Sequence, residues 1–163
     1  MTTRGRHYLA MGAILAALIG TYACNNDDYS SSSSGGGGSS NLVVSASSPA
    51  DGDGTLTASG VLTVNAGGTG FDELNLSQTV GGVNHQVTVT WNTSTYAINS
   101  VQHAWGSGGV SSGFTQCAPG GTTCDPAKVT VNFAGYTVTF NGLVLPDVLG
   151  GTSTSTLTGP VAW

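Results

Sequence analysis

The feature that most constrains this fold is a pair of alternating apolar and polar runs joined by Gly81-Gly82. Residues 74–80 and 83–91 each place apolar side chains in one phase, with the two-residue period of a strand that buries one face. Two glycines between such runs are typical of a tight hairpin turn. Pairing the residues next to the turn sets Leu76 opposite Val87, so the runs predict a β-hairpin with one apolar face.

A second hairpin is predicted between residues 128 and 141. Apolar residues alternate with polar ones on both sides of Ala134-Gly135. Pairing the residues that flank this turn sets Val131 opposite Val138 and leaves lysine, threonine and asparagine on the other face. This division is typical of an antiparallel sheet that packs on one side only.

The other apolar runs are short, and none outside the first 24 residues has the period of a helix. They lie at residues 42–46, 55–64, 96–105, 143–145 and 154–163. A change of phase at Asn99-Ser100 predicts a bulge, Gly106–Gln116 is expected to be a loop, and Pro160 predicts an edge position for the last strand. The sequence therefore predicts an all-β fold, an antiparallel β-sandwich of eight or nine short strands rather than an open barrel.

The N-terminal segment has a different character. Two arginines precede an uncharged apolar stretch from Leu9 to Ile19, and small residues lead into Cys24. A basic start, a short apolar stretch and a small residue before a cut are the parts of a secretory signal, and this stretch is too short to span a bilayer. Residues 25–40 are rich in serine and glycine, which predicts a flexible linker.

This segment resembles the signal peptide of bacterial lipoproteins, with Ala23 directly before Cys24. In that family the cysteine after the cut is lipidated and becomes the first mature residue. The resemblance implies an exported protein held at the outer membrane by palmitate or a similar acyl chain on Cys24, facing the periplasm or the cell surface. Thr21 and Ala23 also suit an ordinary signal-peptidase site, which would release a soluble product. The expected division is a signal peptide over 1–23, a lipidated linker over 24–40 and the β-sandwich domain over 41–163.

The charge of the chain excludes one class of partner. Of its three basic residues, Arg4 and Arg6 lie in the predicted signal, which leaves Lys128 against eight acidic residues and a net charge of −7. Nucleic-acid binding needs clustered cations that displace counterions. No nucleic acid is therefore expected as a partner.

Cys117 and Cys124 are expected to form a disulfide. They enclose six residues, which include Pro119 and two glycines. A metal site would need two further soft ligands, and an exported compartment is oxidising. The pairing also leaves Cys24 available for lipid.

A polar row is predicted on the apolar face of the first hairpin. The hairpin register places His85 opposite Gln78, and the expected bulge places His103 opposite His85. One interpretation is a hydrogen-bonded structural network, and the other is a small site for a transition metal or a polar ligand. The network is favoured, because the only further side chain in the row is Gln78, which is a poor metal ligand.

The segment Asp51-Gly52-Asp53-Gly54 also has two interpretations. Alternating aspartates on a glycine turn can converge on calcium, but aspartate and glycine are equally the ordinary residues of a β-turn. No bidentate acid follows at a useful spacing, so a turn is favoured over a calcium site at Asp51 and Asp53.

The sequence predicts no catalytic residues, because it has neither a nucleophile elbow nor two carboxylates on one strand face. No enzyme activity and no cofactor are expected. The favoured function is a structural or interaction module of the cell envelope, with an envelope protein or a polysaccharide as partner. One alternative is a small metal- or ligand-binding protein that uses the histidine pair, and the other is a carbohydrate-binding module that uses exposed aromatic rings. The aromatic candidates are Trp91, Tyr96, Trp105 and Trp163.

Overall fold

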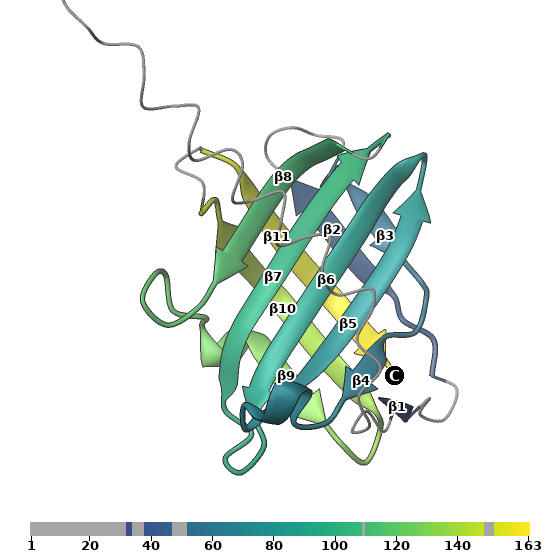
Figure 1. Ribbon diagram of the computed structural model, residues 1–163. Coiled ribbons are helices and arrows are strands. Elements are labelled where there is room, and N and C mark those ends of the chain that lie inside the picture. Colours follow the sequence, from purple (N-terminus) through teal and green to yellow (C-terminus); the bar gives the residue numbers. More distant parts are fainter. Residues whose placement is uncertain (1–31, 34–37, 47–51, 109, 149–151) are drawn as a thin grey trace, which may run out of the picture.

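The computed structural model describes residues 32–33, 38–46, 52–108, 110–148 and 152–163, which form eleven strands in two antiparallel sheets (Figure 1). The first sheet has the order β1 (Ser32–Ser33), β4 (Val61–Thr63), β5 (Phe71–Val80), β6 (Val83–Asn92), β7 (Ile98–Ser107) and β8 (Val110–Cys117). The second has the order β3 (Gly54–Leu56), β2 (Leu42–Ala46), β11 (Thr154–Ala162), β10 (Thr137–Pro146) and β9 (Val129–Asn132). The short 3-10 helices η2 (Ala66–Gly68) and η3 (Pro126–Lys128) lie in connections.

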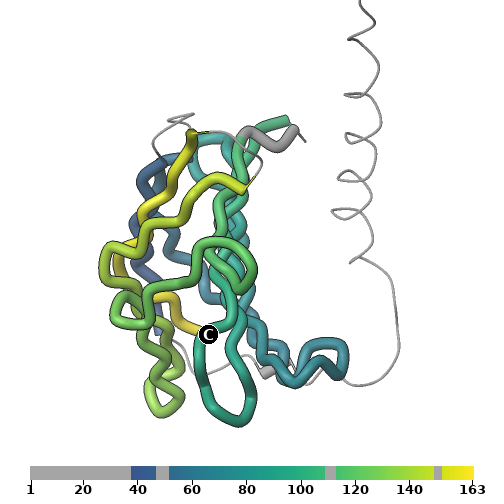
Figure 2. Tube along the Cα trace, turned by 90° about the vertical axis from the view of Figure 1, so that its left-hand side faces the viewer, coloured from purple at the N-terminus to yellow at the C-terminus, as the bar shows by residue number. Residues whose placement is uncertain are grey.

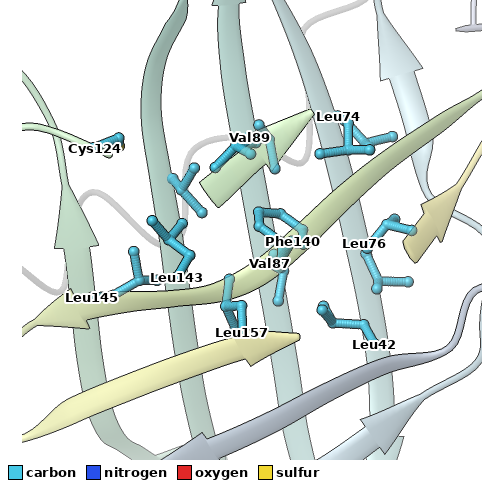
Figure 3. Packing of buried hydrophobic residues seen from close by; sticks show 14 of the residues in the cluster. Leu42, Leu74, Leu76, Val87, Val89, Cys124, Phe140, Leu143, Leu145 and Leu157 are labelled. Atoms are coloured by element: carbon cyan, nitrogen blue, oxygen red, sulfur yellow. The ribbon is translucent and has the colours of Figure 1, made fainter. Parts of the chain in front are cut away.

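The two sheets lie face to face and enclose one apolar core (Figure 2). Burial alternates along the strands as the two-residue period requires, so that Leu42 is buried in β2 while Val43 is exposed. Figure 3 shows Leu76 and Val87 of the first sheet and Leu157 of the second as members of the same buried cluster. The predicted class, an antiparallel β-sandwich, is confirmed.

Both predicted hairpins are confirmed with their registers. Leu76 lies opposite Val87 across β5 and β6, and Val131 lies opposite Val138 across β9 and β10. The Gly81-Gly82 turn has φ values of 60° and 86°, which are the left-handed conformations that a two-residue hairpin turn of this kind needs. The turn residues and the alternation of apolar side chains were sufficient to predict both registers, because the paired strands are neighbours in the sequence.

The prediction of a loop over Gly106–Gln116 is wrong. β7 continues to Ser107 and β8 begins at Val110, so this segment forms a further hairpin. Gly113 lies opposite Trp105, and a Cβ at this position would overlap the indole ring. Glycine therefore belongs to the strand here, because the ring fills the space that a side chain would take.

The predicted edge position of the last strand is also wrong, since β11 lies between β2 and β10. Its ladder with β2 ends where Thr158 lies opposite Val43. Beyond that point the carbonyl of Pro160 accepts a hydrogen bond from the backbone N–H of Asn41 at 2.9 Å. The backbone N–H and C=O of one strand residue point to the same side. The N–H that Pro160 lacks would therefore face the β2 side, where the ladder has already ended.

Residues 55–64, which were expected to form a single strand, divide between the two sheets as β3 and β4. The chain crosses over in between, and the side-chain oxygen of Gln78 accepts hydrogen bonds from the backbone N–H groups of Thr57 at 2.7 Å and Ala58 at 2.9 Å. This division, β8 and β1 add strands to the eight or nine expected, while residues 143–145, expected as a separate run, belong to β10, so the described residues form eleven strands.

Parts of the segment expected to be a flexible linker contact the sandwich. Ser32–Ser33 pairs with β4 as strand β1. Ser40 is buried, and its Oγ accepts a hydrogen bond from the backbone N–H of Ala162 at 3.0 Å. The predicted signal peptide and Cys24 lie outside the described residues. Within the described ranges, no helix is long and apolar enough to cross a membrane.

Candidate functional site

His85 and His103 form a buried hydrogen-bonded pair on the inner face of the first sheet. His85 belongs to β6 and His103 to β7, and both side chains are fully buried. Nδ1 of His85 lies 3.3 Å from Nε2 of His103, and Nδ1 of His103 lies 2.9 Å from Oγ of Ser155 on β11. The pair therefore joins the two sheets through polar contacts inside an apolar core.

The predicted bulge is confirmed, but the predicted register beyond it is shifted by two residues. The pairing of β6 with β7 skips Asn99, as the change of phase indicated. Trp105, rather than His103, lies opposite His85, and His103 lies opposite Val87. The two imidazoles still meet, because diagonal neighbours on one sheet face are within reach of ring side chains.

Gln78 lies opposite His85 as predicted, but its side chain forms hydrogen bonds with the crossing between β3 and β4 instead. Ser155 takes the place in the network that was expected for Gln78. Sequence reasoning missed Ser155, because it comes from the other sheet and lies 52 residues from His103 along the chain. No local pattern marks such a partner.

Burial sets the protonation state of His103. It lowers the pKa of His103 from 6.5 to about 3, and repulsion from a charged His85 is the smaller cause of the shift. Two neutral rings satisfy both contacts. The N–H of one imidazole donates to the acceptor nitrogen of the other. The contact between His103 and Ser155 is then made either by the Ser155 hydroxyl or by an N–H at Nδ1 of His103. If both rings were protonated, two N–H groups would face each other.

Flat neighbours pack against the pair. The rings of His85 and His103 are nearly parallel, with their centres 5.5 Å apart, and the indole of Trp105 stacks on His103 at 4.7 Å. On the second sheet, a Cβ added to Gly54 would lie 3.3 Å from Nε2 of His85. Glycine at this position thus lets the backbone of β3 approach the imidazole closely.

Ser155, His103 and His85 follow one another in the order found in a reactive site, but a substrate has no access to them. A serine hydroxyl bonded to an imidazole, which is bonded to a third group, matches a nucleophile with its base and its orienting residue. However, Ser155 is as deeply buried as His85 and His103. A metal would need further ligands, and the described residues contain no group of three or more histidine, cysteine, aspartate or glutamate side chains that could hold one. The geometry favours the structural network.

A second cluster lies at one end of the sandwich, and we call its three residues, Tyr96, Phe133 and Tyr136, the aromatic end. Their exposed fractions are 56%, 37% and 46%. Tyr96 follows β6, and its ring centre lies 4.6 Å from that of Phe133 in the loop between β9 and β10. The ring centre of Tyr136 lies 6.2 Å from that of Trp163. The two loops lie beside each other at the lower end of the molecule (Figures 1 and 2).

Both tyrosines of the aromatic end have left-handed backbone conformations, with φ of 58° at Tyr96 and 50° at Tyr136. An L-residue in this region costs about 1–2 kcal/mol. Among the described residues, nine glycines have positive φ, and Asn65 is the one other non-glycine residue that does. The chain thus has tyrosine at two positions where glycine would have the lower backbone energy.

The other aromatic candidates lie in the core. Trp91, Trp105 and Trp163 are buried, so these three rings cannot serve the alternative of a carbohydrate-binding module that stacks sugars on exposed aromatic side chains. Nε1 of Trp91 donates a hydrogen bond to a carboxylate oxygen of Asp72 at 3.1 Å, which holds the indole in the interior. Of the four candidates, Tyr96 lies at the surface.

Two smaller predictions have different outcomes. The disulfide between Cys117 and Cys124 is confirmed. Oδ1 of Asp53 accepts a hydrogen bond from the backbone N–H of Ala46 at 2.5 Å, which is the kind of contact expected of a turn residue. Asp51, the other residue of the calcium alternative, lies outside the described residues.

Comparisons with protein-family models, with curated proteins and with solved structures found no match. The histidine pair and the aromatic end are the two features of the described residues that go beyond ordinary core packing.

Proposed function

We propose that this protein is a lipid-anchored, non-enzymatic interaction module of the cell envelope and that the aromatic end is its contact surface. The observation that carries the proposal is the pair of exposed tyrosines in left-handed backbone, Tyr96 and Tyr136. Residues held in unfavourable backbone conformations cluster at functional sites, where the surrounding structure maintains them. Aromatic side chains are also enriched at the contact surfaces of proteins.

Cysteine use supports the lipid anchor. The chain has three cysteines, and Cys117 is joined to Cys124. Cys24 is then the one left for modification, directly after a segment that resembles a lipoprotein signal peptide. A disulfide also suits an exported protein, because the compartments outside the cytosol are oxidising.

The burial of the histidine pair supports a module without catalysis. His85, His103 and Ser155 have side chains that can act in catalysis, but all three are fully buried and therefore inaccessible to a substrate. Their contacts with one another satisfy polar groups that would each cost about 1–3 kcal/mol if they were buried alone. Their role in this proposal is to hold the two sheets together.

The anchor is tested by metabolic labelling with palmitate. We expect the wild-type protein to incorporate label and the Cys24→Ala variant to lose it and to accumulate unprocessed or appear free in the periplasm. An unmodified Cys24 at the mature N-terminus, detected by mass spectrometry, would remove the anchor from the proposal.

The contact surface is tested by photo-crosslinking in intact cells. A benzophenone amino acid replaces Phe133 at the aromatic end or, as a matched control, Val144, which is exposed on β10. We expect adducts from position 133 and few from position 144. Equal yields at the two positions, or none at position 133, would contradict the proposed contact surface.

A further inference from the structure

We infer that the aromatic end lies in the headgroup region of the membrane that holds the Cys24 lipid, so that the domain stands on the bilayer by this end. The inference rests on the proposed function, above all on the lipid at Cys24. It goes further by naming the bilayer surface as the partner of Tyr96, Phe133 and Tyr136.

The N-terminal strand brings the anchor to this end of the sandwich. β1 is antiparallel to β4, with Ser32 opposite Thr63, and β4 leads into residues 64–70. That connection contacts the loop that carries Tyr96, because the backbone N–H and the hydroxyl of Thr93 both donate to the carbonyl of Gly70, at 3.0 and 3.1 Å. Ser32 is therefore the end of β1 nearer to the aromatic end, and Figure 1 shows β1 and β4 in the same lower part of the molecule.

The chain between the anchor and β1 is short. Cys24 and Ser32 are separated by eight residue steps. Eight residue steps span at most ~28 Å, whatever the conformation of the chain. A ten-residue strand such as β7 is about 33 Å long. Because the upper limit of this reach is shorter than such a strand, the lipid at Cys24 stays within less than one strand length of the end of the sandwich at which β1 lies.

The two loops of the aromatic end have the composition of a membrane contact. Residues 92–97 and 132–137 contain no acidic and no basic side chain, although the expected mature chain has a net charge of −7. An anionic lipid surface would repel acidic loops, but it would not repel these. Tyrosine is enriched where membranes meet water, because its ring is apolar and its hydroxyl remains hydrated.

The left-handed backbone conformations of Tyr96 and Tyr136 are explained better by membrane contact than by a purely structural role. Glycine at either position would relieve the backbone, but it would leave no ring to enter the interface. The contacts of Tyr96 with Phe133 and of Tyr136 with Trp163 also pre-position the rings, so little side-chain entropy is lost on membrane contact. A neutral glycan would stack on the same rings, but the nearness of the anchor favours the bilayer.

The test uses the full-length lipidated protein in vesicles of phosphatidylethanolamine and phosphatidylglycerol. An environment-sensitive fluorophore is attached to a cysteine that replaces either Ser94, beside Tyr96, or Ser107, at the opposite end of β7, both of which are exposed. We expect emission at position 94 to shift to shorter wavelength and to be quenched by lipids with a nitroxide at headgroup depth. Emission at position 107 should stay as it is in water.

Paired substitutions separate the rings from the anchor. Tyr96→Gly together with Tyr136→Gly should abolish the shift at position 94, while recovery of the protein with the vesicles stays unchanged because the lipid remains. Tyr96→Phe together with Tyr136→Phe keeps both rings and should retain most of the shift. If the phenylalanine pair lost the shift although both rings are still present, a role that depends on the rings would be contradicted.

Three outcomes would overturn the inference, and each has a different meaning. Equal emission at positions 94 and 107 would mean that the domain is not oriented by its aromatic end, with the anchor intact. A shift at position 94 that needs an added neutral polysaccharide would make a glycan the partner instead. Protein that is not recovered with the vesicles would refute the anchor and the inference together.

Discussion

Nδ1 of His85 and Nε2 of His103 face each other across 3.3 Å in rings that are tilted by only 10°. The gap between them has room for one hydrogen. Since each neutral imidazole has one N–H and one acceptor nitrogen, the contact works while the rings are neutral and fails when both are charged. Acid is therefore expected to act on this contact.

The first prediction concerns pH. Burial lowers the pKa of His103 to about 3, whereas an unfolded histidine titrates near 6.5. The unfolded chain thus binds protons first as the pH falls, and stability that is fully present above pH 6.5 is lost progressively towards pH 3. We expect the free energy of unfolding to be level from pH 7 to 8 and to fall below pH 6.5 by up to ~1.4 kcal/mol for each pH unit through His103.

Urea denaturation at pH 6.5 and pH 5 measures this effect, because ordinary carboxylates stay ionised across that interval. The His103→Gln variant is the control, since glutamine can still form a hydrogen bond with Ser155 but does not titrate. Its stability should depend less on pH than that of the wild type. The same pH dependence in both proteins would show that His103 is not the group responsible.

The second prediction concerns the contact between Gly113 and Trp105. A Cβ on Gly113 would overlap the indole, so Gly113→Ala should lower the free energy of unfolding by about 1–3 kcal/mol through overpacking. Gly121→Ala is the matched control, because the nearest atom to its added Cβ would be the carbonyl oxygen of Ala118 at 3.9 Å. Equal effects of the two substitutions in chemical denaturation would contradict this account of β8.

The third prediction isolates the backbone of Tyr96. Glycine and alanine both remove the ring, but only alanine keeps a Cβ in left-handed backbone. The Tyr96→Gly variant should therefore be more stable than Tyr96→Ala by about 1 kcal/mol. Thermal denaturation measures this difference. Thr95, which lies in the same loop and has negative φ, is the control, and its alanine variant should be more stable than its glycine variant. If the alanine variant were more stable than the glycine variant at both positions, the backbone of Tyr96 would not be strained.

The fourth prediction concerns the disulfide. Cys117 and Cys124 are separated by seven positions, and closing a loop of this size contributes about 2–3 kcal/mol in the chain-entropy account. Cys117→Ser should lower stability by about 2 kcal/mol without changing the fold. A reductant should destabilise the wild type to a similar degree and leave a Cys117→Ser, Cys124→Ser double variant unaffected. Two free thiols in a non-reducing alkylation assay of the exported protein would contradict the bond.

The sequence alone predicted the elements whose partners are close along the chain. The hairpins around Gly81-Gly82 and Ala134-Gly135 and the bridge from Cys117 to Cys124 follow from turn chemistry, strand period and short spacing. Gly106–Gln116 did not look like a strand, because its glycine and serine content is also that of a loop. Only the indole of Trp105 shows why Gly113 belongs in β8.

The sequence by itself determined the all-β class, the two local hairpin registers and the common face of His85 and His103, because these depend on a two-residue period and on turns between neighbours. The tertiary structure decided what those residues contact. Ser155 reaches His103 from the other sheet, and the hairpins that carry Tyr96 and Tyr136 belong to different sheets that meet at one end. Such contacts depend on how two sheets stack and which ends coincide, and no local pattern of side chains encodes that relation.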